Sequence, residues 1–159
     1  MAWYTSIYDT LEDIKQKIID EYRAKGLKAS GDFERNIKIG RQGRYKVVLT
    51  LPYYSEFISK FKSNEGGRGP GGFPPVDAIE KWVKDKGLNL RDLSTGRFTK
   101  RTQSTYKQVA FLIGRKIADQ GTDIYLKKRE PIDLDQITDN VFDYKMEEIA
   151  DRILQELNI

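Results

Sequence analysis

The chain has 159 residues, with 28 Lys and Arg against 24 Asp and Glu, and it contains neither cysteine nor histidine. The missing cysteines exclude disulfides and thiolate metal sites, and the missing histidines remove the commonest general base and every imidazole-dependent triad. We expect one domain, residues 1–159, with no resident cofactor, no metal and no membrane-spanning segment, made inside the cell.

Charge is distributed unevenly along the chain. Residues 31–130 carry 21 basic and 11 acidic side chains, whereas residues 131–159 carry 2 basic and 8 acidic ones. The middle of the chain therefore predicts a basic surface able to face phosphates, and the last segment predicts an acidic helix. A solvated, dipolar surface is the alternative interpretation.

Three elements are predicted before the glycine-rich stretch. Apolar residues at helical spacing predict a helix over Asp9 to Lys25, and Gly26 is its expected stop. Two strands follow, over Phe33 to Ile39 and over Arg44 to about Ile58, and the turn-forming residues between them predict a β-hairpin. Pro52 cannot donate a ladder hydrogen bond, so the second strand is expected to bend or to lie at an edge there.

Glycine occupies five of the seven positions in residues 66–72, and a helix is predicted soon after them. Pro75 suits the first turn of that helix, and Gly87 suits a left-handed C-terminal cap. A glycine-rich loop that opens a helix could cradle a phosphate, because exposed backbone N–H groups and the helix dipole favour an anion. The loop lacks the G-K-[ST] and G-x-G-x-x-G patterns, so we favour a flexible loop that contacts a partner.

The second half of the chain predicts a basic loop and two more helices. Residues 89–105 combine basic, hydroxyl and glycine residues and are expected to form a mobile loop. Apolar spacing predicts a helix from about Gln103 to Gln120, in which Gly114 permits a neighbour to approach closely. A short strand is expected over Ile124 to Leu126, and a last helix over Asp135 to Leu157. The expected inner stripe of the last helix is Phe142, Met146, Ile149, Ile153 and Leu157.

These elements predict an α+β fold. A small antiparallel, hairpin-based sheet is expected to pack against the N-terminal helix and two or three further helices. Within the single domain, residues 1–130 form the expected core, with flexible loops at 62–74 and 89–104, and residues 131–159 add the acidic C-terminal helix.

Candidate partner-binding residues lie on both sides of the glycine-rich stretch. Aromatic residues at the observed spacing could stack on nucleic-acid bases, but they more often divide between the core and an oligomer contact. Phe73 is expected to act as an apolar anchor once a neighbouring subunit orders its loop. The candidates for oligomer or partner contacts are Tyr53, Tyr54, Phe57, Arg68 and Phe73.

Two charged constellations suggest other chemistry. The basic loop could grip nucleic-acid phosphates without reading sequence, and its candidate residues are Arg91, Arg97, Lys100 and Arg101. Asp135, Asp139 and Asp143 fall on one helical face and could instead hold Mg²⁺ for phosphodiester chemistry. A helix cap at Asp133 or Asp135 and a solvated face near the positive end of the helix explain the series more simply. This acidic series is Asp133, Asp135, Asp139 and Asp143.

The order of these signals resembles a known family. The hairpin ends in V-x-L-x-x-x-Y at Val47 to Tyr53, and PGGFPP, IEKWVKDKGL and AFLIGRKIADQGT follow, the last at Ala110 to Thr122. This is similar to the tail-completion or neck proteins of tailed bacteriophages, and the resemblance covers about residues 28–124. It implies an α+β protomer without enzymatic activity that forms a ring between the portal-bearing head and the tail.

The sequence is therefore compatible with three functions. The first, implied by the resemblance, is a structural virion protein of the neck or tail region, assembled in the host cytoplasm. Its expected partners are its own copies, portal-side or adaptor proteins, tail proteins and, through the basic loop, channel DNA. The second is a non-enzymatic nucleic-acid-binding module that uses the basic loop. The third is a Mg²⁺-dependent nuclease built on the acidic series.

Overall fold

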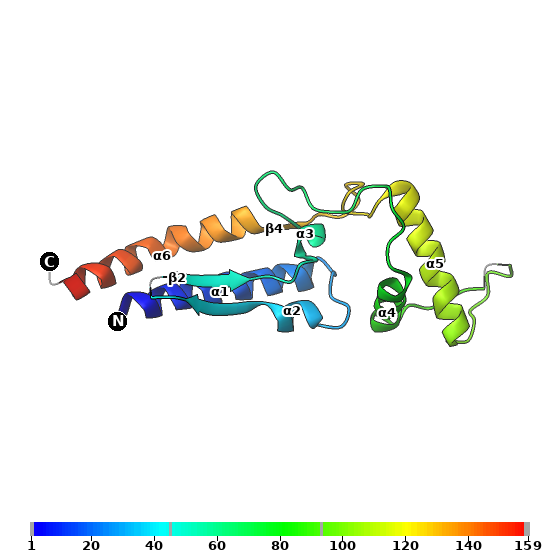
Figure 1. The fold of residues 1–159 in the computed structure, drawn as a ribbon, viewed down its shortest axis with the longest axis horizontal. Helices are drawn as coiled ribbons and strands as arrows, with labels where there is room; N and C mark the ends of the chain where they lie inside the picture. Colours follow the sequence, from blue (N-terminus) through cyan, green and yellow to red (C-terminus); the bar gives the residue numbers. More distant parts are fainter. Residues whose placement is uncertain (1, 45, 93, 158–159) are drawn as a thin grey trace. The chain divides into compact units, whose positions relative to one another are not determined.

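The computed structural model describes residues 2–44, 46–92 and 94–157, and the chain divides into two units (Figure 1). Unit 1 comprises residues 1–27, 32–66 and 131–159, and unit 2 comprises residues 28–31 and 67–130. The sequence predicted one domain with residues 131–159 added to its core. That domain count stays a prediction, and within unit 1 those last residues lie with the N-terminal helix, because the two long helices pack together.

The elements found among the described residues confirm the predicted α+β fold. No helix among them is long and apolar enough to cross a membrane. The helices are α1 (Ala2–Ala24), α2 (Asp32–Asn36), α3 (Ser55–Ile58), α4 (Val76–Lys86), α5 (Gln103–Gln120) and α6 (Leu134–Leu157). The strands are β1 (Lys38–Gln42), β2 (Lys46–Thr50), β3 (Ser59–Lys60) and β4 (Ile132–Asp133), of which β1 pairs antiparallel with β2, and β3 pairs parallel with β4.

The core of unit 1 is formed by α1, α2, α6 and the β1–β2 hairpin. Ile14, Ile18 and Tyr22 recur every four residues along α1 and are buried, as the helical pattern predicted. Ile137 and Val141 of α6 belong to the same buried cluster. Each such aliphatic side chain stabilises the fold by about 1.5–3 kcal/mol when it is fully buried.

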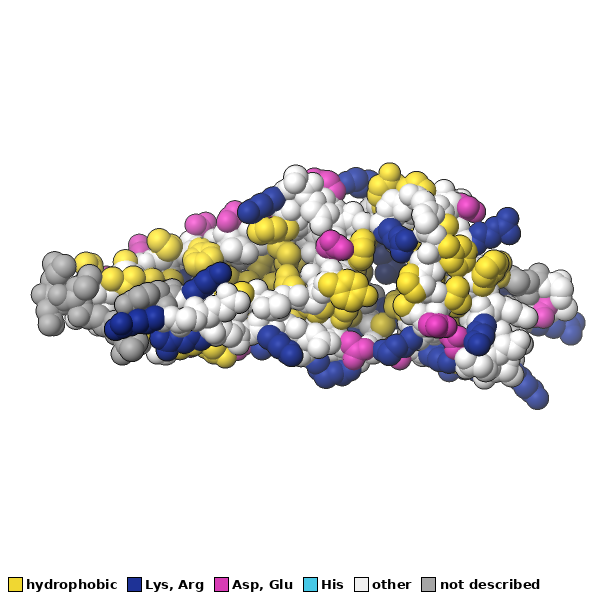
Figure 2. Space-filling model, in the orientation of Figure 1, with side chains coloured by type: hydrophobic (Ala, Val, Ile, Leu, Met, Phe, Trp, Pro, Cys, Tyr) yellow, Lys and Arg dark blue, Asp and Glu magenta, His cyan; other side chains and the backbone are white. Residues whose placement is uncertain are grey.

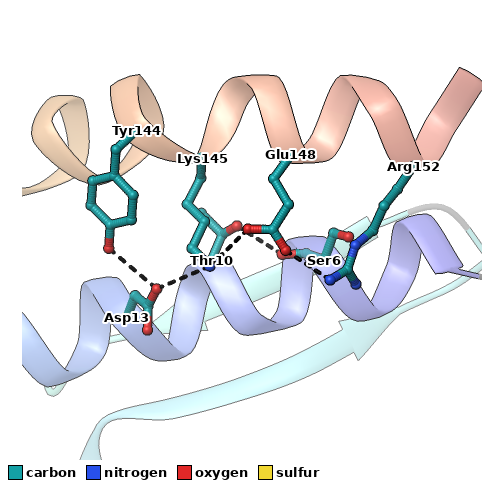
Figure 3. Close-up of polar contacts among 7 residues, drawn as sticks. All are labelled: Ser6, Thr10, Asp13, Tyr144, Lys145, Glu148 and Arg152. Carbon is teal, nitrogen blue, oxygen red and sulfur yellow. Dashed lines mark hydrogen bonds and ion pairs between the residues drawn. The ribbon is translucent and has the colours of Figure 1, made fainter.

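Polar side chains flank the contact between α1 and α6 (Figure 3). The Tyr144 hydroxyl donates to the Asp13 carboxylate at 3.2 Å, and Lys145 Nζ lies 3.5 Å from the same carboxylate. Glu148 accepts from Lys145 at 3.1 Å and from Arg152 at 2.8 Å. These groups are partly exposed, so each pair contributes little to stability and mainly favours one register of the two helices.

The predicted strand over Phe33 to Ile39 is wrong, because its first half forms α2. Acidic residues occupy the first turn of α2, where they complement the helix dipole. The short helix turns Phe33 into the core, with its ring centroid 4.5 Å from that of Tyr22. Burial of one large aromatic side chain therefore decides the local structure, and β1 begins only at Lys38.

The predicted hairpin is confirmed, although its second strand is shorter than expected. Ile39 lies opposite Leu49, and Gly43 adopts a φ of 70° in the turn. Strand β2 ends at Thr50, and Pro52 and a turn lead into α3, so the strand does not continue to Ile58.

Unit 2 is built on α4 and α5, and both helix ends follow the sequence signals. Gly87 caps α4 with a φ of 61°, and Thr102 caps α5 by accepting a hydrogen bond from the Thr105 amide. Gly121 ends α5 as predicted. The buried apolar residues between these helices are Ile79, Val83, Leu90 and Ala110.

The short strand predicted over Ile124 to Leu126 is wrong. The Leu126 amide donates to the Thr122 carbonyl at 2.9 Å, and the Lys127 amide donates to the Ile124 carbonyl at 3.0 Å. These local bonds wind the segment into consecutive turns, and no strand is assigned to residues 121–130.

The predicted inner stripe of α6 is also wrong. The α6 residues buried against α1 include Ile137 and Val141, whereas only Ile149 of the described stripe is buried. The Leu157 side chain lies outside the described side chains. The stripe members left exposed are Phe142, Met146 and Ile153.

Candidate interaction surfaces

The glycine-rich loop, residues 66–72, is packed over its first half and open over its second. A Cβ added at Gly67 would lie 2.4 Å from the Tyr125 backbone nitrogen, and one added at Gly121 would lie 2.7 Å from the Tyr125 ring. A Cβ at Gly72 would meet no atom within 4 Å. The glycines of the first half therefore permit a close approach between two backbone segments, and only the second half has the openness expected of a partner-facing loop.

Backbone hydrogen bonds fix the packed half of this loop. The Arg68 amide donates to Thr122 Oγ1 at 2.9 Å, and the Thr122 amide donates to the Arg68 carbonyl at 2.8 Å. In the open half, the Gly71 amide donates to the Ala118 carbonyl at 2.9 Å, so this backbone is also anchored to α5. The phosphate-cradle alternative needs such amides to point at a ligand, so this arrangement does not support it.

Two of the candidate partner residues in this region differ in their surroundings. The Arg68 guanidinium donates to the Gly72 carbonyl at 2.9 Å, so this side chain braces the loop. Phe73 is partly exposed, and its ring centroid lies 5.3 Å from that of Phe111. A Cβ at Gly114 would lie 2.8 Å from the Phe73 ring, which confirms that this glycine permits a close neighbour.

The three aromatic candidates after β2 divide between the core and the surface. Tyr53 exposes 84% of its surface, the highest fraction among the exposed large hydrophobic residues. Tyr54 is half-buried and packs against the core, with its ring centroid 6.2 Å from that of Phe33. Phe57 is 36% exposed. Tyr53 and Phe57 are therefore accessible to a partner, and Tyr54 positions Tyr53 through a perpendicular ring contact at 5.5 Å.

The basic loop contains a hydrogen-bonded turn between Arg91 and Phe98, and the mobility expected from its composition stays a prediction. The Asp92 amide donates to the Arg97 carbonyl at 2.8 Å, and the Asp92 carboxylate accepts hydrogen bonds from the amides of Ser94 and Thr95. The Ser94 hydroxyl, followed by the Thr95 amide, the Thr95 hydroxyl and the Ser94 amide, lowers the pKa of Asp92 to about 2. The Asp92 carboxylate within this basic segment therefore stabilises the turn.

The four basic candidates of this turn are exposed, and two of them, Arg91 and Arg101, contact different neighbours. The Arg91 guanidinium lies 4.7 Å from the centroid of the Phe98 ring, and these two residues form an isolated β-bridge. Arg101 donates to the Gly87 carbonyl at 3.2 Å and therefore ties the turn to the end of α4. Arg97 and Lys100 are exposed. The turn thus presents cations and the exposed Phe98 ring together.

The acidic series extends from the end of β4 into the first turns of α6. Asp133 lies 2.8 Å from Lys60 Nζ, and Asp135 accepts a hydrogen bond from the Lys62 amide at 2.7 Å. Burial opposes ionisation of Asp133, but Lys60 and the Gln136 amide more than offset it, so the pKa is lowered. Asp139 and Asp143 are exposed. No group of three or more acidic side chains among the described residues could hold a metal ion, so this arrangement does not support the nuclease alternative.

A buried carboxylate in unit 2 was not singled out from the sequence. Glu80 is 5% exposed, and its Oε1 accepts from Lys84 Nζ at 2.6 Å and from Gln103 Nε2 at 2.5 Å. The hydrogen bond from Lys84 lowers the pKa of Glu80, burial opposes this effect, and Gln103 reinforces it. Spacing of four residues between Glu80 and Lys84 indicates their pairing, but nothing in the sequence pattern indicates Gln103.

Comparisons with protein-family models, curated proteins and solved structures found no match.

Proposed function

We propose that this protein is a structural component of a tailed-phage virion, a ring-forming head–tail connector or tail-completion protein of the neck. Its role is to join portal-side and tail-side rings around the DNA channel, without enzymatic activity. It would be assembled in the host cytoplasm and remain in the neck or tail of the particle.

The observation that carries the proposal is the contrast in charge between the two units. Unit 1 has 13 basic and 17 acidic residues, and unit 2 has 15 basic and 7 acidic residues. A protomer of a closed ring needs two different surfaces that meet head to tail. Units of opposite charge, each with exposed aromatic side chains, supply such surfaces.

The segments that carry the resemblance are consistent with a scaffold that presents loops. PGGFPP contributes the open half of the glycine-rich loop, and IEKWVKDKGL forms most of α4 and its glycine cap. AFLIGRKIADQGT supplies the end of α5 and the glycine that packs on Tyr125. These segments build the core and close backbone contacts of unit 2, which leaves its exposed loops able to contact other proteins.

The test combines the isolated protein with phage particles. We expect native mass spectrometry and electron microscopy of the purified chain to show closed rings, and we expect the protein at a fixed copy number in purified particles. Arg97→Glu with Lys100→Glu should impair particle assembly or DNA retention, because it reverses the exposed charge of the basic turn. Lys116→Glu, an exposed change on α5, is the control. Normal particles from the double variant would show that the basic turn is not needed for particle assembly or DNA retention.

A second candidate function is favoured by the hydrogen-bonded basic turn. Arg91 stacked on Phe98, with Arg97 and Lys100 exposed nearby in sequence, could bind nucleic-acid phosphates without reading sequence. Binding of this kind should weaken steeply as salt is raised, and Arg97→Glu should reduce the salt dependence. Ring formation through apolar contacts should depend on salt much less. Measured affinities for duplex DNA across a salt series separate the two functions.

A further inference from the structure

Helix α6 has an apolar stripe of which the rest of its unit buries only Ile149. Phe142, Met146, Ile149 and Ile153 follow one another at spacings of four, three and four residues, which places them on one side of the helix. Met146 is 56% exposed, and Phe142 and Ile153 are each 38% exposed. Helix α1 covers a different face, the one that carries Val141.

The stripe continues into an apolar groove of unit 1. The groove has a volume of about 340 Å³ and lies where α1, β2 and the start of α6 meet. Phe142 belongs both to the stripe and to the wall of the groove. Six of the lining residues are Leu11, Leu49, Leu51, Phe61, Leu134 and Phe142.

Charge argues against a second α6 as the cover of this stripe. Residues 131–159 have eight acidic and two basic side chains, so two such helices side by side would repel each other. Both basic residues, Lys145 and Arg152, already pair with Glu148 (Figure 3). A partner for the stripe should therefore carry apolar side chains framed by cations.

Unit 2 of a second copy has this chemistry. Phe73 and Phe111 form an aromatic pair, and Phe111 is 52% exposed on an otherwise polar face of α5. Lys107 and Arg115 lie one turn before and one turn after Phe111, and both are exposed. Hydrophobic side chains gather over α5 in Figure 2, next to basic ones. Aromatic side chains of this size bury about 150–250 Å² each when an interface covers them.

We propose that the apolar stripe and groove of one copy receive the Phe73–Phe111 pair of a second copy. The two surfaces differ, so after a first contact the pair of copies retains one unoccupied surface of each kind, and the assembly grows head to tail. This contact specifies which surfaces meet in the ring. The pairing itself is independent of the proposed function, and only the closure of the assembly into a ring rests on that function. Cations beside Phe111 face the acidic flanks of α6, which favours this pairing over both like-with-like pairings.

The test uses variants that each disable one surface. Phe111→Ser removes the exposed aromatic side chain, and Met146→Ser with Ile153→Ser removes the centre of the stripe. All three positions are exposed, so the variants should keep the wild-type melting temperature. The matched controls are Phe98→Ser in unit 2 and Leu154→Ser on another face of α6, both at exposed positions outside the proposed contact.

Sedimentation velocity and native mass spectrometry give the readout. We expect wild type and both controls to form oligomers whose size rises with concentration, and each disabled variant to remain monomeric. An equimolar mixture of the two disabled variants should form dimers and stop there, because one intact surface of each kind remains across the pair.

Three outcomes would overturn the inference, and they bear differently on the ring. If both disabled variants formed oligomers of the same size as wild type, this contact would be refuted and the proposed ring would still stand. Monomeric variants whose mixture is also monomeric would refute the head-to-tail pairing. A wild-type chain that stays monomeric at every concentration would refute both this contact and a ring formed by the chain alone.

Discussion

The two units achieve stability in different ways. Unit 1 has the larger buried cluster, built mainly from aliphatic and aromatic residues of two long helices, α1 and α6, with support from the hairpin. Unit 2 has a smaller buried cluster between α4 and α5, and it relies more on glycine contacts and turn hydrogen bonds. A large apolar core tolerates variation in its loops, whereas a small one depends on individual backbone contacts.

The largest effect is expected in the core of unit 1. Phe33→Ala should lower the free energy of unfolding by about 3–5 kcal/mol, because it leaves a cavity beside Tyr22 and Tyr54. Urea denaturation measures this loss. Phe98→Ala, the same change at an exposed ring in unit 2, should stay within about 0.5 kcal/mol of wild type. Equal effects of the two substitutions would show that burial does not distinguish the sites.

A smaller but still large effect is expected in the glycine-rich loop of unit 2. Gly67→Ala should cost about 1–3 kcal/mol by forcing Tyr125 to move. Its φ of 79° adds a penalty of about 1–2 kcal/mol for any residue with a Cβ. Gly72→Ala is the matched control, since its Cβ would meet open space, and its melting temperature should match that of wild type. A stable Gly67→Ala variant would mean that the loop is open along its whole length.

Elements with strong periodicity could be predicted from the sequence. Helix α5 has the predicted bounds, and the cap of α4 at Gly87 follows from the glycine alone. Phe33 was misassigned because a short helix and a short strand give similar apolar patterns, and tertiary packing decided between them. Periodicity also identified an apolar side of α6, but it could not show that α1 covers a neighbouring face.

Surfaces were harder to predict than elements. Phe73 could be proposed as an exposed anchor from its loop, whereas Phe111 could not, because an apolar residue within a helix is expected to face the core. The structure pairs it with Phe73 across elements distant in sequence. The basic turn is held by one carboxylate, Asp92, and composition alone did not indicate these hydrogen bonds.

The next effect concerns Glu80, which links α4 to α5. Its pKa is lowered in the folded state, so its contribution to stability is present above the ordinary pKa of about 4.5 and is lost as the pH falls below it. Glu80→Gln should therefore reduce the melting temperature at pH 7, and the difference from wild type should shrink towards pH 3. Glu147→Gln, at an exposed position on α6, is the control. A difference that is constant from pH 7 to pH 3 would contradict ion pairing with Lys84.

The smallest and most local effect is expected at Asp92. Its pKa of about 2 lies below the ordinary value of 3.8, so the ionised carboxylate favours the turn above pH 4, and this contribution is lost as the pH falls through about 2. Asp92→Asn should speed hydrogen exchange at the Ser94 and Thr95 amides at neutral pH, while amides in the centre of α5 keep their wild-type rates. An NMR titration of the carboxyl carbon measures the pKa directly. A midpoint near 3.8 would show that the hydroxyl and amide donors do not hold the carboxylate, and the turn would then have the mobility that its composition indicated. For Asp92→Asn we expect an unfolding midpoint close to that of wild type, because the bonds lost are exposed and local, in contrast to the buried contacts at Phe33.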